Sequence, residues 1–375
     1  MGISGAAQTR LNAMLKEFQT LAQSQVGYPC NQKFDYSELS VFMRYCLNNV
    51  GDPFHESNFR SNTHRIEREV IAEFADLMHL PQAQAWGYIT SGGTEGNMYG
   101  LYLGRELYPK GVVYFSQDTH YSVLKILHVL NVRNIMIKSQ DNGEIDYDDL
   151  YETIRIHRDV PVIFMANIGT TMKGAVDDLT KVRNILNDLT VNNFYIHADA
   201  ALSGMILAFV DDPQPYDFDA GIDSIAISGH KLIGAPLPCG VVLTRRDYVN
   251  RIARAIEYVG VLDTTLPGSR NALTPLMLWY AFEKYGHDGF KEIVADMLAV
   301  AEYAVLRFNK FGVKAWRNKN SATVVIPKPS ATFLHNWQIA SQGEIAHIIT
   351  MPHVDRPLVD RLVDEYIKDR QTQAA

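Results

Sequence analysis

Lys231 lies in surroundings that are unusual for a lysine. The stretch SGHKLIGAPLPCG, residues 228–240, places His230 and Lys231 among residues that are small, apolar or chain-bending. A lysine there loses hydration, and its charged ammonium form becomes less favourable. The uncharged amine is a nucleophile that forms Schiff bases with carbonyl compounds. The sequence therefore favours a chemical role for Lys231 over a place on the protein surface.

Asp199 is a second polar residue in an apolar setting, because it comes at the end of the run FYIHADAAL. An unpaired carboxylate is costly in such a place, so we expect a cationic partner. A structural salt bridge or a helix cap is the alternative interpretation. His197, two residues earlier on the same face of the expected strand, is more typical of a group that orients its neighbours than of a catalyst.

Two further clusters follow expected strands. In SGGTEGN, residues 91–97, a glycine-rich turn leads into a helix, and its free amides suit a phosphate dianion. The segment lacks both the GxxxxGK[ST] and the GxGxxG patterns, which argues against a nucleoside triphosphate and a dinucleotide. His120 follows a strand in YFSQDTHYSV, where a capping or core role is the alternative.

Pyridoxal 5'-phosphate needs all of these groups at once. It requires a lysine amine, a carboxylate that keeps its ring nitrogen protonated, a phosphate cup and a flat group that stacks on the ring. Lys231 supplies the amine and Asp199 the carboxylate. The phosphate cup consists of Gly92, Gly93 and Thr94 with Ser228, and His120 is the flat group. We therefore predict pyridoxal phosphate as the cofactor.

The elements that must position these residues alternate between short apolar runs and helical patterns. Continuous apolar runs are typical of strands buried on both faces, and sites form at the carboxyl ends of such strands. A large, mostly parallel α/β sheet is therefore expected. Residues 64–80 form an amphipathic helical pattern. The expected strands are WGYIT, GVVYFS, NIMIKS, PVIFMANIG, FYIHADAAL, DSIAISG and GVVLTRR.

The pattern changes after about residue 250. Residues 290–312 predict a long amphipathic helix that ends at Gly312, and SATVVIPKP and IAHIITMPH predict strands of a smaller α+β domain. We divide the chain into an N-terminal helical segment (1–60, with two short helices), a large cofactor-binding α/β domain (61–255), and an active-site loop with a small C-terminal domain (256–375).

Composition excludes several classes of protein. A net charge of −7 over 375 residues argues against nucleic-acid binding, and no apolar run approaches the length of a membrane span. The three cysteines are widely spaced, so we expect no disulfide framework and no metal site. A reducing cytoplasm is the expected location.

The motifs SGGTEGN, THYSV, NIGTTMKGAVDDL, IHADAALSGM and AHIITMPH closely resemble those of pyridoxal-phosphate-dependent group II amino-acid decarboxylases, from about residue 27 to residue 353. The resemblance is greatest to the bacterial histidine decarboxylases and extends to the plant serine decarboxylases. It implies the aspartate-aminotransferase fold (fold type I) and a homodimer with active sites at the subunit interface.

The resemblance also implies roles for single residues. Lys231 would be the Schiff-base lysine, Asp199 the partner of the pyridinium, and His120 the residue that stacks on the cofactor and touches the substrate. The remaining residues would hold the phosphate (Gly93, Thr94 and Ser228, with His230 beside it) or contact the ring and its hydroxyl (Thr171 and Ala201).

The substrate is less narrowly defined. HADAALSGM and AWRNKNS resemble the histidine enzymes, whereas LNNVGDPFHESN and KGAVDDL are closer to the serine enzymes, and VLDTTLPGSRNALTP departs from both. We expect decarboxylation of L-histidine to histamine. The alternatives are L-serine or another small or aromatic amino acid and, more distantly, an aminotransferase of the same fold. Tyr258, His120 and Lys231 are candidates for protonating the α-carbon.

Overall fold

A seven-stranded sheet forms the centre of the computed structural model, which describes residues 2–252, 254–256 and 261–374. The strand order is β2-β8-β7-β6-β5-β3-β4, and β8 runs antiparallel to both of its neighbours. No crossover helix separates β7 from β8, so the chain returns in the opposite direction. The strands are β2 (Ala85–Thr90), β3 (Val112–Ser116), β4 (Arg133–Ile137), β5 (Val162–Asn167), β6 (Phe194–Asp199), β7 (Ser224–Ser228) and β8 (Gly240–Arg245). All seven predicted strands are confirmed.

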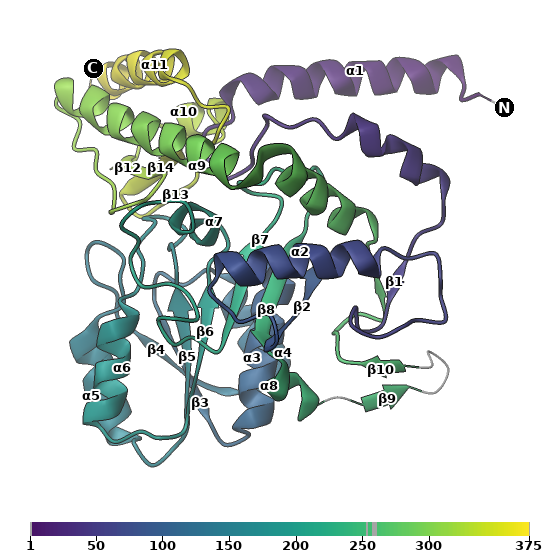
Figure 1. Ribbon diagram of the computed structural model, residues 1–375. Coiled ribbons are helices and arrows are strands. Elements are labelled where there is room, and N and C mark those ends of the chain that lie inside the picture. Colours follow the sequence, from purple (N-terminus) through teal and green to yellow (C-terminus); the bar gives the residue numbers. More distant parts are fainter. Residues whose placement is uncertain (1, 253, 257–260, 375) are drawn as a thin grey trace.

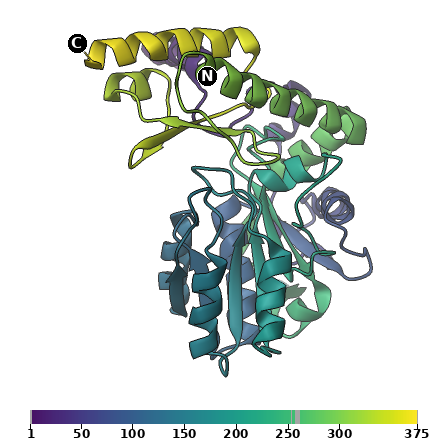
Figure 2. The ribbon, with the colours of Figure 1, turned by 90° about the vertical axis from the view of Figure 1, so that its left-hand side faces the viewer.

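Helices cover both faces of this sheet (Figures 1 and 2). The predicted helix at 64–80 is α2 (His64–Leu77), and Val70, Ile71 and Phe74 form part of its buried face. Helix α3 (Gly93–Leu107) packs against β6, β7 and β8. The other helices of this part are α4 (Ser122–Leu130), α5 (Tyr147–Ile156), α6 (Leu179–Asp188), α7 (Ser203–Leu207) and α8 (Arg246–Asn250).

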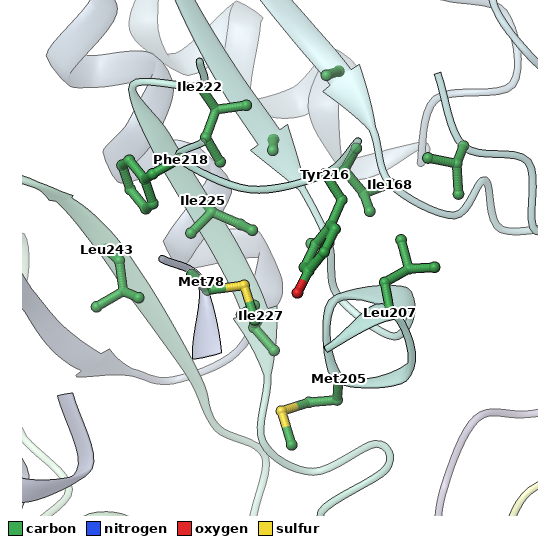
Figure 3. Packing of buried hydrophobic residues seen from close by; sticks show 14 of the residues in the cluster. Met78, Ile168, Met205, Leu207, Tyr216, Phe218, Ile222, Ile225, Ile227 and Leu243 are labelled. Carbon is green, nitrogen blue, oxygen red and sulfur yellow. The ribbon is translucent and has the colours of Figure 1, made fainter. Parts of the chain in front are cut away.

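The largest apolar cluster fills the space between the sheet and its helices. Figure 3 shows Ile225 and Ile227 of β7 and Leu243 of β8 beside Met78, which follows α2. These side chains are fully buried. Burial of apolar area on this scale is the main force that holds the sheet and the strand ends in place.

The C-terminal part begins with α9 (Leu273–Lys310), which contains a kink at Gly286, where φ is 58°. The helix starts earlier than residue 290, where the sequence placed it, because two helices join across this glycine. Gly312 follows the helix with φ of 74°, as expected for a helix end. A small antiparallel sheet, β12-β14-β13, follows and confirms both predicted strands. Its elements and helices are β12 (Thr323–Pro327), α10 (Ala331–Asn336), β13 (Ser341–Gln342), β14 (Ile345–Ile349) and α11 (Arg356–Ala374).

The N-terminal part departs from the expected two short helices. Helix α1 (Gly5–Leu21) has 17 residues, and η1 (Ala22–Ser24) and η2 (Ser37–Arg44) are 3₁₀ helices. The loop-rich stretch near residues 250–272 contains short paired strands: β9 (Arg254–Ile256) with β10 (Val261–Asp263), and β11 (Ser269–Arg270) with β1 (Asn49–Val50). In the described part of the chain, no helix combines the length and apolarity that crossing a bilayer requires.

Candidate active site

A cavity of about 520 Å³ lies at the carboxyl ends of β5, β6 and β7, with residues 27–30 along another wall. Gly92 is not among its lining residues; it precedes α3 with φ of 153°, a conformation that favours glycine. Every other predicted site residue lines the cavity: Gly93, Thr94, His120, Thr171, Asp199, Ala201, Ser228, His230 and Lys231. The structure therefore brings together residues from five separate strand ends.

Lys231 extends into this cavity from the loop between β7 and β8. Burial lowers the pKa of its amine, and the charges of Asp199 and Cys30 oppose that shift only in part. Asn31 fixes the backbone of the same loop, because its Nδ2 donates to the carbonyl oxygen of Leu232 at 2.9 Å. The result is an amine that gives up its proton more readily than an exposed lysine does.

Asp199 is the last residue of β6, and its carboxylate accepts two hydrogen bonds. Asn97 Nδ2 donates to Oδ2 at 2.7 Å, and the backbone N–H of Ala201 donates to Oδ1 at 3.1 Å. Both donors are neutral. Among the described residues, none forms an ion pair with Asp199, so the predicted cationic partner is not supplied by this part of the chain. A protonated ring nitrogen has the charge that this carboxylate prefers.

Gly93, Thr94 and Ser228 form one end of the cavity. A Cβ atom on Gly93 would come within 3.0 Å of Ser228 Oγ, so the glycine lets the start of α3 approach the end of β7. The first N–H groups of a helix have no partner within the helix and attract anions. Burial lowers the pKa of His230 beside them, which favours its uncharged form. This end has the donors that a phosphate group requires.

His120 lies between β3 and α4 and lines the cavity. Its Nδ1 accepts the backbone N–H of Ser122 at 3.3 Å, so the neutral ring carries its proton on Nε2. Burial lowers the pKa of His120. The charge of Asp199 opposes this shift, and the charge of Lys231 adds to it. A neutral, flat ring near Lys231 and Asp199 suits the predicted stacking role.

Several parts of the cavity wall were not assigned from the sequence, among them Asn97, residues 27–30 and His347. Asn97 lies one turn after Gly93 in α3. An asparagine on the face of this helix that packs on the sheet needs a hydrogen-bond partner, and this is the signal that could have identified it. His347 belongs to the AHIITMPH motif; its Nε2 and Nδ1 face the carbonyl oxygens of Gly27 and Met172 at 3.1 and 3.3 Å. Tyr258, a candidate proton donor, lies outside the described residues.

Comparison with known proteins indicates the same cofactor as the residues of this cavity. The family model for the pyridoxal-dependent decarboxylase conserved domain matches residues 58–313. Histidine decarboxylase of Morganella morganii is 48% identical over 93% of each chain, and that of Klebsiella aerogenes is 44% identical over 100% of each. The structure of L-methionine decarboxylase from Streptomyces sp. 590 superposes with a TM-score of 0.90 at 26% identity, covering 100% of this chain and 98% of that one.

Glutamate decarboxylase from Lactobacillus brevis shares the fold, with a TM-score of 0.80 at 18% identity over 99% of this chain and 93% of that one. The expected fold type I and the expected cofactor are therefore confirmed. By its family match and its full-length relatives, this chain belongs to the pyridoxal-dependent decarboxylase family.

Proposed function

We propose that this protein decarboxylates L-histidine to histamine and carbon dioxide. The observation that carries the proposal is the 44–48% identity, over nearly the whole chain, to several bacterial proteins named histidine decarboxylase. The cavity supports it, because it combines a buried amine, a carboxylate and an anion cradle within one volume.

Lys231 and Asp199 would act at opposite ends of the cofactor ring. When bound, pyridoxal phosphate supplies an electron sink for the electron pair that remains when carbon dioxide leaves. Lys231 would hold the cofactor through its amine, and its lowered pKa favours the uncharged form that this role requires. The Asp199 carboxylate, oriented by Asn97, would keep the ring nitrogen protonated. We assign these two residues to catalysis.

The remaining predicted residues would hold the cofactor in place. Backbone amides at Gly93 and Thr94 and the hydroxyl of Ser228 would bind the phosphate, with Gly92 shaping the turn and His230 beside it. His120 would lie on one face of the ring, and Thr171 and Ala201 would contact the ring and its hydroxyl. The support for these roles is their shared place on the cavity wall, apart from Gly92.

The proton that replaces carbon dioxide on the α-carbon needs a donor near the reacting atom. His120 and Lys231 line the cavity, and His120 presents its Nε2–H away from Ser122. Tyr258 remains the third candidate. Replacing His120 by phenylalanine, which keeps a flat ring but has no proton to give, would separate a stacking role from proton donation.

Identification of the product tests the proposed reaction. Purified holoenzyme is incubated with single L-amino acids, and the amine is identified by mass spectrometry while carbon dioxide is measured. Histamine from L-histidine, in equal amount to carbon dioxide and without keto acid, is the expected result. Ethanolamine from L-serine would identify the serine reaction instead, and a keto acid without carbon dioxide would identify an aminotransferase.

We also infer a homodimer whose two subunits share the active sites. Helix α1 buries none of its residues, and Leu11, Leu15 and Phe18 are exposed along it; Figure 1 shows it extending to the edge of the molecule. Tyr121 lines the cavity and is nevertheless 68% exposed. A second subunit would cover these apolar surfaces. Sedimentation of the wild type and of Leu15→Glu with Phe18→Glu tests this, because the double variant should shift toward monomer.

The cytoplasm remains our proposal for the compartment. Cys30, Cys46 and Cys239 are all free thiols in the structure. Free thiols are typical of proteins from reducing compartments.

A further inference from the structure

A row of buried polar side chains continues from Asp199 into the interior of the sheet. We call Asp199, Asn97, His197 and Ser224 the Asp199 relay. Asn97 Oδ1 lies 3.0 Å from His197 Nε2, and His197 Nδ1 lies 2.7 Å from Ser224 Oγ. The Tyr195 hydroxyl donates to Ser224 Oγ at 2.7 Å. His197 and Ser224 are completely buried.

The chemistry of these groups fixes the direction of every hydrogen bond in the relay. An ionised carboxylate only accepts, so the amide nitrogen of Asn97 faces Asp199 and its oxygen faces His197. That oxygen needs a donor, which places the His197 proton on Nε2. The Nδ1 atom then accepts from the Ser224 hydroxyl, whose oxygen accepts from Tyr195. All donors therefore point toward Asp199.

The surroundings keep the His197 imidazole neutral and in one place. Complete burial lowers its pKa to about 3, so the ring carries a single proton near neutral pH. Helix α3 lies directly against the ring: a Cβ atom on residue 100 would stand 2.1 Å from His197 Nδ1, and Gly100 has none. Only a residue without a side chain permits this approach, so helix and imidazole fix each other.

We propose that Asn97 and His197 are positioning residues: a neutral His197, protonated on Nε2, orients the Asn97 amide, which in turn holds the Asp199 carboxylate toward the ring nitrogen of the cofactor. The inference rests on the proposed role of Asp199 in cofactor binding. The relay extends that role from Asn97 on the cavity wall to His197 and Ser224, which do not line the cavity. A relay that only satisfied buried polar groups would contribute to protein stability but not to cofactor binding.

The tautomer of His197 is tested without cofactor, by nitrogen-15 NMR of the full chain labelled at histidine. His197→Gln assigns the signal by its disappearance. We expect an Nε2–H tautomer that does not titrate from about pH 5.5 to about pH 8.5, the range in which an ordinary histidine changes charge. A proton on Nδ1, or titration near pH 6.5, would overturn the proposal.

Variants then test whether the relay acts on the cofactor. His197→Leu removes both polar contacts, whereas His197→Gln keeps one donor and one acceptor. Tyr195→Phe removes a buried hydroxyl that lies outside the relay, behind Ser224, and is the control. Residues that orient a metal ligand typically contribute 10–100-fold to affinity, and by analogy we expect the cofactor Kd to rise about 10–100-fold in His197→Leu. His197→Gln and Tyr195→Phe should stay within about threefold of wild type, which is under 1 kcal/mol.

The bound cofactor gives a second signal, because its visible absorption depends on the protonation of the ring. Asn97→Ala and His197→Leu should change this spectrum in the same direction as Asp199→Asn. If His197→Leu lowers the melting temperature but leaves cofactor Kd and spectrum like those of Tyr195→Phe, the relay is only structural. If Asp199→Asn itself binds the cofactor as wild type does, the role of Asp199 fails instead, whatever the tautomer of His197.

Discussion

The backbone N–H of Asn31 donates a hydrogen bond of 3.2 Å to the carbonyl oxygen of Lys231. The Asn31 side chain binds the next carbonyl, that of Leu232, and the Tyr36 hydroxyl binds that of Ile233 at 3.2 Å. Three consecutive carbonyl oxygens, in the loop between β7 and β8 that carries Lys231, thus accept hydrogen bonds from a segment of the N-terminal part of the chain. The position of the reactive amine therefore depends on residues that precede the sheet.

Replacing Asn31 by alanine should loosen this loop. The change leaves the Leu232 carbonyl without its donor in a buried place, which costs about 1–3 kcal/mol in unfolding free energy. Urea unfolding measures the loss, and a fluorescence titration measures cofactor affinity, which should fall as well. Asn134→Ala is the matched control, because the exposed Asn134 amide also binds a backbone carbonyl. Equal stability and cofactor affinity of the two variants would show that the Asn31 side-chain hydrogen bond has no influence on Lys231.

Lys231→Ala should abolish covalent attachment of the cofactor. Only an amine can form the Schiff base that borohydride reduces to a stable adduct. The experiment is reduction of the holoprotein followed by peptide mass mapping. Lys173→Ala, which removes a partly buried lysine paired with Asp118, should keep the adduct. An adduct retained in Lys231→Ala would identify another lysine as the anchor.

The strands could be predicted from the sequence because each is a continuous apolar run. Six of these strands are buried along nearly their whole length, whereas β4 at the edge of the sheet is mostly exposed. Polar residues at the strand ends, such as Asp199 and Ser228, then gather at one edge of the sheet. This is why residues from separate motifs line one cavity. The division of the chain at residues 60 and 255 stays a prediction.

The partners of these residues could not be predicted in the same way. The contact of Asn97 with Asp199 joins residues 102 positions apart and exists only because α3 packs across β6. The sequence indicated a buried carboxylate and a cationic partner, but not the neutral amide that binds it. Likewise, periodicity gave the second half of α9 but missed its first half, since Gly286 interrupts the pattern.

Asp199→Ala should reduce turnover severely. Without the carboxylate the ring nitrogen loses the anion that keeps it protonated, and the electron sink is weakened. The loss of one such electrostatic group typically costs 10²–10³ in kcat, and we expect at least about 100-fold here. Initial rates at saturating cofactor measure the effect. Asp141→Ala, at an exposed turn, is the control, and near-normal turnover in Asp199→Ala would reject the assignment.

His197 should make the protein less stable in acid. An exposed histidine has a pKa of about 6.5, and burial lowers that of His197 to about 3. Between these values the unfolded chain binds one proton more, so the free energy of unfolding falls as the pH falls below about 6.5. His197→Gln removes this contribution.

The difference between wild type and His197→Gln appears in the slope of the unfolding free energy against pH. Near pH 5, one proton corresponds to about 1.4 kcal/mol per pH unit, so the unfolding free energy of His197→Gln should depend on pH less steeply by about that amount. Urea unfolding from pH 7 to pH 5 measures it, and contributions from other groups cancel in the comparison. His287→Gln, at an exposed ring, is the control. Parallel curves for wild type and His197→Gln would contradict a buried neutral imidazole.

Arg270 and Glu67 form an ion pair with 2% and 0% of their side chains exposed. Glu67 also accepts the N–H of Ile89 at 2.8 Å, and Arg270 donates to the carbonyl of Gly51 at 3.0 Å. Removing one partner of a buried pair leaves an uncompensated charge, so Arg270→Met should cost about 3–5 kcal/mol. Arg155→Met, which breaks the exposed pair with Glu152, should cost less than about 1 kcal/mol.

The double variant Glu67→Leu with Arg270→Met separates charge burial from packing, because it leaves neither charge unpaired. It should recover part of the stability that Arg270→Met loses, as measured by urea unfolding. Arg270 belongs to VLDTTLPGSRNALTP, the stretch that departs from the decarboxylase pattern, and it anchors this stretch to α2. If the stretch helps to shape the substrate site, KM for histidine should rise in Arg270→Met while the borohydride adduct at Lys231 persists. A lost adduct would instead mean that the ion pair supports the whole cofactor site.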